Sequence, residues 1–127
     1  MPIFCIDFLI KCEKEYLLLK RVDEPLAGLF WVPGGRLKLN ENIQDFAIRV
    51  QRREIGRYFN NYKLKGFSNY FFDKTNNSRA VHTPTLLFEI YTKNKFIPNI
   101  DKTHSAFIWT DELPIFLVKN LITFEKG

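Results

Sequence analysis

One stretch of the chain, residues 31–56, concentrates the residue types that bind phosphates and metal ions. It opens with Trp31 and a double glycine, Gly34-Gly35, and runs through carboxylates and arginines to Glu54. Glycine tolerates positive φ and lets a ligand approach the backbone closely. A carboxylate such as Glu54 offers oxygen atoms to a hard cation. We therefore take this stretch as the centre of the candidate site.

The second half of this stretch predicts one amphipathic helix. Its apolar residues recur at i, i+3, i+4 and i+7, namely Ile43, Phe46, Ala47 and Val50. Asn40 or Asn42 can cap the start of the helix, and Gly56 suits the position after its end. Glu54 then projects from the last turn, beside the apolar stripe.

The spacing of this stretch resembles a Nudix box, the loop–helix motif of hydrolases that act on nucleoside diphosphates linked to another group. The matching residues are Gly35, Glu41, Arg49, Glu54 and Gly56. The box is reduced, because Val50 and Arg53 replace two glutamates that hold Mg²⁺ in the family. The reduced form is similar to that of the GDP-mannose mannosyl hydrolase branch, and the resemblance covers nearly the whole chain.

The resemblance implies an α+β fold, a Nudix-type α/β/α sandwich with a mixed sheet, in a single domain of residues 1–127. Apolar runs and alternation predict strands at 3–10, 16–21, 29–32, 63–72, 83–91 and 106–109. A turn is expected at Gly34-Gly35, and residues 73–80 read as a polar loop. Thr110 is expected to cap a second helix that continues toward Leu121.

Asp7 interrupts the first strand, which otherwise reads as buried on both faces. By alternation it shares a face with Cys5 and Leu9. A lone buried charge is costly, so Asp7 either lies at a sheet edge or faces a polar cavity. Its apolar neighbours favour the cavity.

Two arginines flank the candidate site, Arg21 at the end of a strand and Arg36 after the double glycine. Arginines at loop edges are usually solvated, and this pattern alone would favour that reading. The family resemblance favours the alternative, in which both guanidinium groups clamp the oxygens of a diphosphate.

Of the two histidines, His82 and His104, the second lies in the polar segment 101–105, five residues before Trp109. A lone histidine in a loop is more often exposed than catalytic. In GDP-mannose mannosyl hydrolases the histidine at the matching position is the general base. The resemblance therefore implies that His104 deprotonates a water that attacks the anomeric carbon of a sugar nucleotide. Arg21 would stabilise the departing diphosphate, and Asp7 would bind substrate hydroxyls or the base.

The resemblance also implies a metal site. Mg²⁺, or Mn²⁺ in its place, would be held by Glu54, the Gly34 carbonyl and phosphate oxygens. Three positions depart from the family pattern: Thr103 replaces a glutamine ligand of the metal, Thr83 a tyrosine at the leaving phosphate, and Tyr70 a histidine near the leaving group. We retain Thr103 as a metal ligand and Tyr70 and Thr83 as substrate-binding residues.

Three functions follow from these residues. The first is hydrolysis of GDP-mannose, or GDP-glucose, to GDP and free sugar. The second is Nudix pyrophosphohydrolysis, in which water attacks phosphorus; it needs more carboxylates than Glu54, and Glu41 is expected to pair with Arg49 instead. The third is a sugar-nucleotide binding domain without catalysis, which Thr103 and Arg53 would suit.

The composition agrees with a globular enzyme. The chain has 127 residues, a net charge of +5, and two cysteines, too few for a disulfide framework or a metal cluster. The charge suits a polyphosphate ligand but is equally typical of a basic surface. The sequence has no dense Lys/Arg tract that would indicate nucleic-acid binding. It has no apolar segment long enough to span a membrane, and no signal peptide is evident. We expect a cytoplasmic protein, and the resemblance implies a homodimer.

Overall fold

The computed structural model describes residues 2–23, 26–72, 81–100 and 102–124. Their strands are β1 (Cys5–Cys12), β2 (Glu15–Arg21), β3 (Phe30–Trp31), β4 (Gly34–Arg36), β5 (Lys63–Phe72), β6 (Val81–Tyr91), β7 (His104–Thr110) and β8 (Leu121–Thr123). Their helices are α1 (Ile43–Ile55) and α2 (Ile115–Asn120). The predicted polar loop 73–80 lies outside the described residues.

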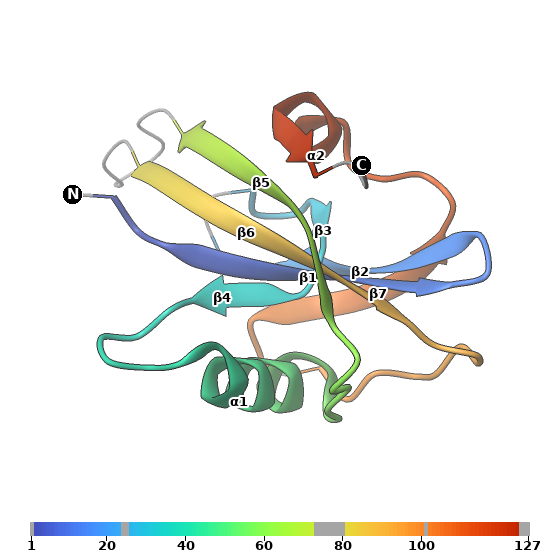
Figure 1. The fold of residues 1–127 in the computed structure, drawn as a ribbon. Coiled ribbons are helices and arrows are strands. Elements are labelled where there is room, and N and C mark those ends of the chain that lie inside the picture. Colours follow the sequence, from blue (N-terminus) through green and yellow to red (C-terminus); the bar gives the residue numbers. More distant parts are fainter. Residues whose placement is uncertain (1, 24–25, 73–80, 101, 125–127) are drawn as a thin grey trace.

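The strands form one mixed sheet with the order β3-β2-β1-β6-β5-β8, in which β4 also pairs with β1 and β7 with β2. β1 and β6 are parallel, and the other pairs are antiparallel. Figure 1 shows α1 and α2 on opposite sides of this sheet. The predicted α/β/α sandwich with a mixed sheet is therefore confirmed.

β1 and β2 pair with each other only near their shared turn, where Lys11 lies opposite Tyr16. Further along, β1 pairs with β4 and β2 pairs with β3. The two strands thus diverge, and the segment from β3 to β4 lies between them. This divergence places the start of β1 and the end of β2 around an opening in the sheet.

Each face of the sheet has its own apolar core. The first core packs the sheet against α1, and the fully buried Phe46, Ala47 and Val50 belong to it, as their spacing predicts. Ile43, the first residue of the predicted stripe, is instead exposed. The second core includes Leu9, Trp31, Tyr70 and Leu117, on the side of α2.

The two ends of α1 lie at residues that the sequence predicts to cap the helix. The side chain of Asn42, and not that of Asn40, accepts a hydrogen bond of 2.8 Å from the Asp45 N–H. At the other end Gly56 has φ of 77°, and its N–H donates to the Arg52 carbonyl. This left-handed conformation is the one that glycine adopts without a steric penalty.

Three local predictions are wrong. Gly34-Gly35 is part of strand β4 and not a turn. His104 begins β7 and is buried, because that strand starts two residues earlier than its apolar run. Thr110 ends β7, and α2 begins only after Pro114 with no side-chain cap. The proline accounts for the delay, since the residue before a proline disfavours the helical conformation.

Neither helix of the described residues has the length and apolar character of a membrane span.

Candidate active site

A pocket of about 350 Å³ opens where β1 and β2 diverge. All five residues predicted to bind substrate line it, together with the predicted metal ligand Gly34: Asp7, Arg21, Arg36, Tyr70 and Thr83. They come from β1, β2, β4, β5 and β6, so only the assembled sheet brings them together. We call this cavity the Asp7 pocket.

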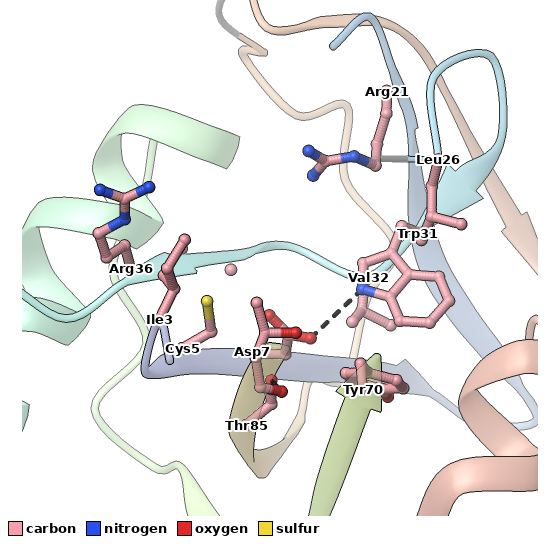
Figure 2. A pocket seen from close by; sticks show the side chains of 13 residues that line it. Ile3, Cys5, Asp7, Arg21, Leu26, Trp31, Val32, Arg36, Tyr70 and Thr85 are labelled. Carbon is pink, nitrogen blue, oxygen red and sulfur yellow. Dashed lines mark hydrogen bonds between the residues drawn. The ribbon is translucent and has the colours of Figure 1, made fainter. Parts of the chain in front are cut away.

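The two arginines lie on opposite sides of the opening of the Asp7 pocket. Figure 2 shows Arg21 and Arg36 apart, with Cys5 and Asp7 on β1 between and below them. Two guanidinium groups around one opening suit an anionic ligand that spans it, because each can donate paired hydrogen bonds to phosphate oxygens.

Asp7 is buried, with 7% of its surface exposed, and its Oδ2 accepts a hydrogen bond of 3.3 Å from the Trp31 indole N–H. Burial raises the pKa of Asp7 to about 7, against the opposing effects of the Trp31 hydrogen bond and of Arg21. Near neutral pH this carboxyl group can therefore be protonated or ionised, and can donate or accept a hydrogen bond.

Apart from Asp7 and the two arginines, the polar side chains of the pocket are neutral at physiological pH. Tyr70 and Thr83 are opposite each other in the pairing of β5 with β6, and both are buried. Burial raises the pKa of Tyr70 to about 12, and burial together with Asp7 raises the pKa of the Cys5 thiol to about 11. The phenol and thiol thus remain protonated, so Cys5 is a poor nucleophile here.

Glu54, His104, Thr103 and Arg53 form a second group, which we call the Glu54 cluster. His104 Nδ1 lies 3.6 Å from Glu54 Oε2 and 3.1 Å from Thr103 Oγ1. Arg53 Nε lies 3.6 Å from the same Glu54 oxygen. The side chains of Glu54 and His104 are 5% and 4% exposed, so the two groups meet away from bulk water.

Gly34 connects the Glu54 cluster to the Asp7 pocket. Its N–H donates to Glu54 Oε1 at 3.4 Å, while the residue itself lines the pocket opposite Asp7. A Cβ atom on Gly34 would lie 2.0 Å from Asp7 Oδ1 and 2.7 Å from the Ile6 carbonyl oxygen. Glycine is therefore required here by the close approach of β4 to β1.

Glu41 forms an ion pair with Arg49. Both of its oxygens accept hydrogen bonds from Arg49, at 2.7 and 2.8 Å, and Arg49 also donates to the Arg36 carbonyl at 3.0 Å. The expected pairing of Glu41 with Arg49 is confirmed, and it ties the loop after β4 to α1.

The donor set is small for a divalent cation. Among the described residues, no three His, Cys, Asp or Glu side chains lie together in a way that would hold a metal ion. Glu54 supplies carboxylate oxygens beside the backbone of Gly34, whereas Mg²⁺ prefers six oxygen ligands. These residues therefore fit a cation that shares its ligands with phosphate oxygens and water, and they do not form a complete protein cage.

Sequence reasoning missed the role of Trp31, which lines the pocket and donates to Asp7. Thr85 and Leu26 were also not singled out, although both line the pocket. A signal for Trp31 existed, because a buried indole N–H usually requires a hydrogen-bond acceptor and Asp7 is the one carboxylate in the first predicted strand.

No family model matches the chain. Among curated proteins, an ADP-ribose pyrophosphatase from Methanocaldococcus jannaschii is 31% identical over 55 residues, which cover 43% of this chain and 32% of that protein. The low-salt glycan biosynthesis protein Agl8 from Haloferax volcanii is 38% identical over 56 residues, covering 44% and 36%. The matched segment thus spans about a third of the length of these relatives.

Solved structures resemble the fold over most of its length. A MutT protein from Methanosarcina mazei superposes with a TM-score of 0.72 at 22% identity, covering 93% of this chain and 89% of that one. The NUDIX domain of Shewanella oneidensis NrtR, solved with ADP ribose, superposes with a TM-score of 0.66 at 13% identity, covering 87% and 73%. The chain therefore has the Nudix fold.

Proposed function

We propose that this chain hydrolyses a nucleoside-diphosphate sugar, with GDP-mannose or GDP-glucose as the favoured substrate. The observation that carries the proposal is the position of His104, 3.6 Å from Glu54. Glu54 in turn accepts the N–H of Gly34, which lines a pocket with two arginines and a buried carboxyl group. Such a site offers a base, fixed positive charge and a hydroxyl-binding group within one small region.

The Asp7 pocket would bind the substrate. Arg21 and Arg36 would neutralise the diphosphate, whose charge grows as it leaves the sugar. Asp7, Tyr70 and Thr83 would hydrogen-bond sugar hydroxyls or phosphate oxygens, since their polar atoms line the pocket.

His104 would act as the general base. A proton on Nδ1, which lies near Glu54 and Thr103, would leave the lone pair on Nε2, and that nitrogen would then accept a proton from water. The water oxygen attacks the anomeric carbon, the bond from that carbon to the phosphate oxygen breaks, and GDP leaves with the electron pair. Displacement at carbon predicts inversion at the anomeric centre.

A divalent cation, Mg²⁺ or Mn²⁺, would be held by Glu54 and the Gly34 carbonyl together with substrate phosphates, with Thr103 as a neighbouring hydroxyl. When bound, it would neutralise charge on the leaving diphosphate. A homodimer in the cytoplasm remains our prediction from the sequence.

Pyrophosphohydrolysis is the second candidate function, favoured by the name of the Methanocaldococcus jannaschii relative. Both reactions would use the Asp7 pocket for the diphosphate, and they differ in the atom that water attacks.

Product analysis in ¹⁸O-labelled water tests the proposal, with GDP-mannose, GDP-glucose and ADP-ribose as substrates in the presence of Mg²⁺. We expect the label in the free sugar and GDP as co-product. Label in a phosphate, with release of GMP or AMP, would instead establish pyrophosphohydrolysis. Binding without turnover would support a sugar-nucleotide binding domain. For His104→Ala we expect lost turnover with retained binding, and unchanged turnover would exclude His104 as the base.

A further inference from the structure

Arg53 lies at the edge of the Glu54 cluster and has no role in the function proposed above. It belongs to the last turn of α1, and its side chain is 42% exposed, whereas that of Glu54 is 5% exposed. Arg53 Nε lies 3.6 Å from Glu54 Oε2. Exposed side chains change rotamer rapidly, so the guanidinium group can turn to a new partner without any change in the core.

Both carboxylate oxygens of Glu54 have contacts in the structure. Oε1 accepts the Gly34 N–H at 3.4 Å, and Oε2 lies 3.6 Å from both Arg53 Nε and His104 Nδ1. A divalent cation at Oε2 would therefore approach a guanidinium group that carries the same sign of charge. Like charges a few ångströms apart repel, most strongly where water is excluded. The cation that Glu54 would hold competes with Arg53.

The far end of the Arg53 side chain lies against the wall of the Asp7 pocket. A Cβ atom added to Gly35 would lie 2.9 Å from Arg53 Nη2, and Gly35 is one of the residues that line the pocket. A phosphate group bound beside Gly35 would thus lie near this guanidinium group. The same paired N–H donors that bind a carboxylate also bind phosphate oxygens.

We propose that Arg53 makes cation binding at Glu54 depend on the phosphate group of the ligand. This inference rests on the proposed function, in which the Asp7 pocket holds a diphosphate. In the ligand-free protein the guanidinium group pairs with Glu54 and keeps the cation away. When the ligand binds, the guanidinium group moves to a phosphate oxygen, and Glu54 then shares the cation with that phosphate.

The exchange leaves every charge with a partner. Arg53 replaces one anionic oxygen by another, which costs little because both contacts are charge-assisted hydrogen bonds. Glu54 is buried, and a buried carboxylate that lost its partner would destabilise the protein strongly. Here it replaces the guanidinium group by the cation, so it is never left unpaired.

Two titrations of the whole protein test this inference, and neither depends on turnover. The electron paramagnetic resonance signal of free Mn²⁺ gives the cation affinity of the ligand-free protein. Calorimetry with GDP in the presence of EDTA gives the ligand affinity without a cation. Arg53→Gln removes the charge and keeps a good helix former. Arg52→Gln is the matched control, because Arg52 is an exposed arginine of the same helical turn.

For wild type we expect weak Mn²⁺ binding without a ligand. Arg53→Gln should bind Mn²⁺ about fivefold more tightly, the upper range for an ion pair with one exposed partner, because the competing guanidinium group is gone. The same variant should bind GDP in EDTA about fivefold more weakly, since a phosphate contact of the same kind is lost. Arg52→Gln should match wild type in both titrations. Adding Glu54→Gln to Arg53→Gln should abolish the gain in Mn²⁺ affinity.

Three outcomes would overturn the inference. Equal Mn²⁺ affinity of wild type and Arg53→Gln would mean that Arg53 does not keep the cation from Glu54. Unchanged GDP affinity would mean that the guanidinium group does not move to the phosphate. Equal shifts in Arg53→Gln and Arg52→Gln would assign both effects to net charge alone.

None of these three outcomes touches the proposed function, which fails on a different result. That result is wild-type protein that, with Mg²⁺, releases neither GDP nor free sugar from the sugar nucleotides. If wild type does not bind GDP at all, the move of Arg53 to the phosphate and the proposed function fail together.

Discussion

The Asp7 pocket and the Glu54 cluster are neighbours across strand β4, yet the groups that surround their buried carboxyl groups differ. In the pocket, Asp7 has one neutral donor, Trp31, and burial raises its pKa to about 7. In the cluster, Glu54 lies among the Gly34 N–H, Arg53 and His104. Under the proposed function, Asp7 would be a carboxyl group with an adjustable charge that contacts the ligand, and Glu54 would be a fixed carboxylate that orients His104.

Gly34→Ala should give the largest effect, because this residue belongs to both regions. The added Cβ would lie 2.0 Å from Asp7 Oδ1, so β4 must move relative to β1, and the Gly34 N–H that donates to Glu54 moves with it. We expect a loss of about 3 kcal/mol in the free energy of unfolding, the upper range for overpacking, and loss of ligand binding. Urea unfolding and calorimetry measure both.

Gly35→Ala is the matched control for this prediction. Its Cβ would approach within 2.9 Å of the end of the flexible Arg53 side chain, which can move. Equal destabilisation by the two variants would contradict the argument that close strand packing requires Gly34.

Glu54→Gln should lower turnover more than it lowers ligand binding, and so distinguish the role of the Glu54 cluster from that of the Asp7 pocket. The amide oxygen can still accept the Gly34 N–H, but the charge beside His104 is lost. We expect turnover to fall by about 10²-fold, the lower range for general-base catalysis, with a smaller change in GDP affinity. Steady-state kinetics and calorimetry check this, and an equal loss in binding and turnover would show that Glu54 serves the pocket instead.

Asp7→Asn should change how stability depends on pH. Because the folded state raises the pKa of Asp7, the protonated carboxyl group stabilises the fold below about pH 4, and this contribution is lost as pH rises through about 7. Asparagine stays neutral throughout. The free energy of unfolding of the variant should therefore rise relative to wild type between pH 4 and 7, by a few kcal/mol in order of magnitude.

Urea unfolding at pH 4, 5, 6, 7 and 8 measures this difference. Asp111→Asn, at an exposed carboxyl group, serves as the control and should show no such trend. A constant difference between Asp7→Asn and wild type would mean that the Asp7 pKa is not raised.

Glu41→Gln should have the smallest effect. Arg49 lowers the pKa of Glu41 to about 2, so this pair stabilises the fold above about pH 4 and loses that contribution as pH falls through about 2. We expect a slightly lower melting temperature at pH 7 and unchanged turnover. A large loss of turnover in the presence of Mg²⁺ would instead make Glu41 part of the catalytic machinery.

The parts of the fold governed by local chemistry could be predicted from the sequence. The Asn42 cap and Gly56 bound α1, and β5 spans residues 63–72 as expected. Two strands that the sequence did not predict are short. β4 has three residues and β8 three, so neither carries a pattern of its own, and both form because a neighbouring strand offers hydrogen bonds.

The candidate site was predicted residue by residue only with the help of the family resemblance. Alternation placed Asp7 on a face with Cys5, and both line the pocket. No local pattern shows that Tyr70 and Thr83 join them, since that requires the pairing of β5 with β6 and of β6 with β1. The contact of Trp31 with Asp7 likewise depends on how β3 and β4 lie beside the diverging strands.

The parallel pairing of β1 with β6 also bears on how the chain folds. It joins residues 80 positions apart, such as Cys5 and Thr85, and both of these line the Asp7 pocket. Such non-local contacts raise contact order and slow folding, because a long loop must close before the pairing can stabilise it. During synthesis β1 therefore cannot pair with β6 until β6 has been made. The pocket can form only after Thr85, two thirds of the way along these 127 residues, has emerged.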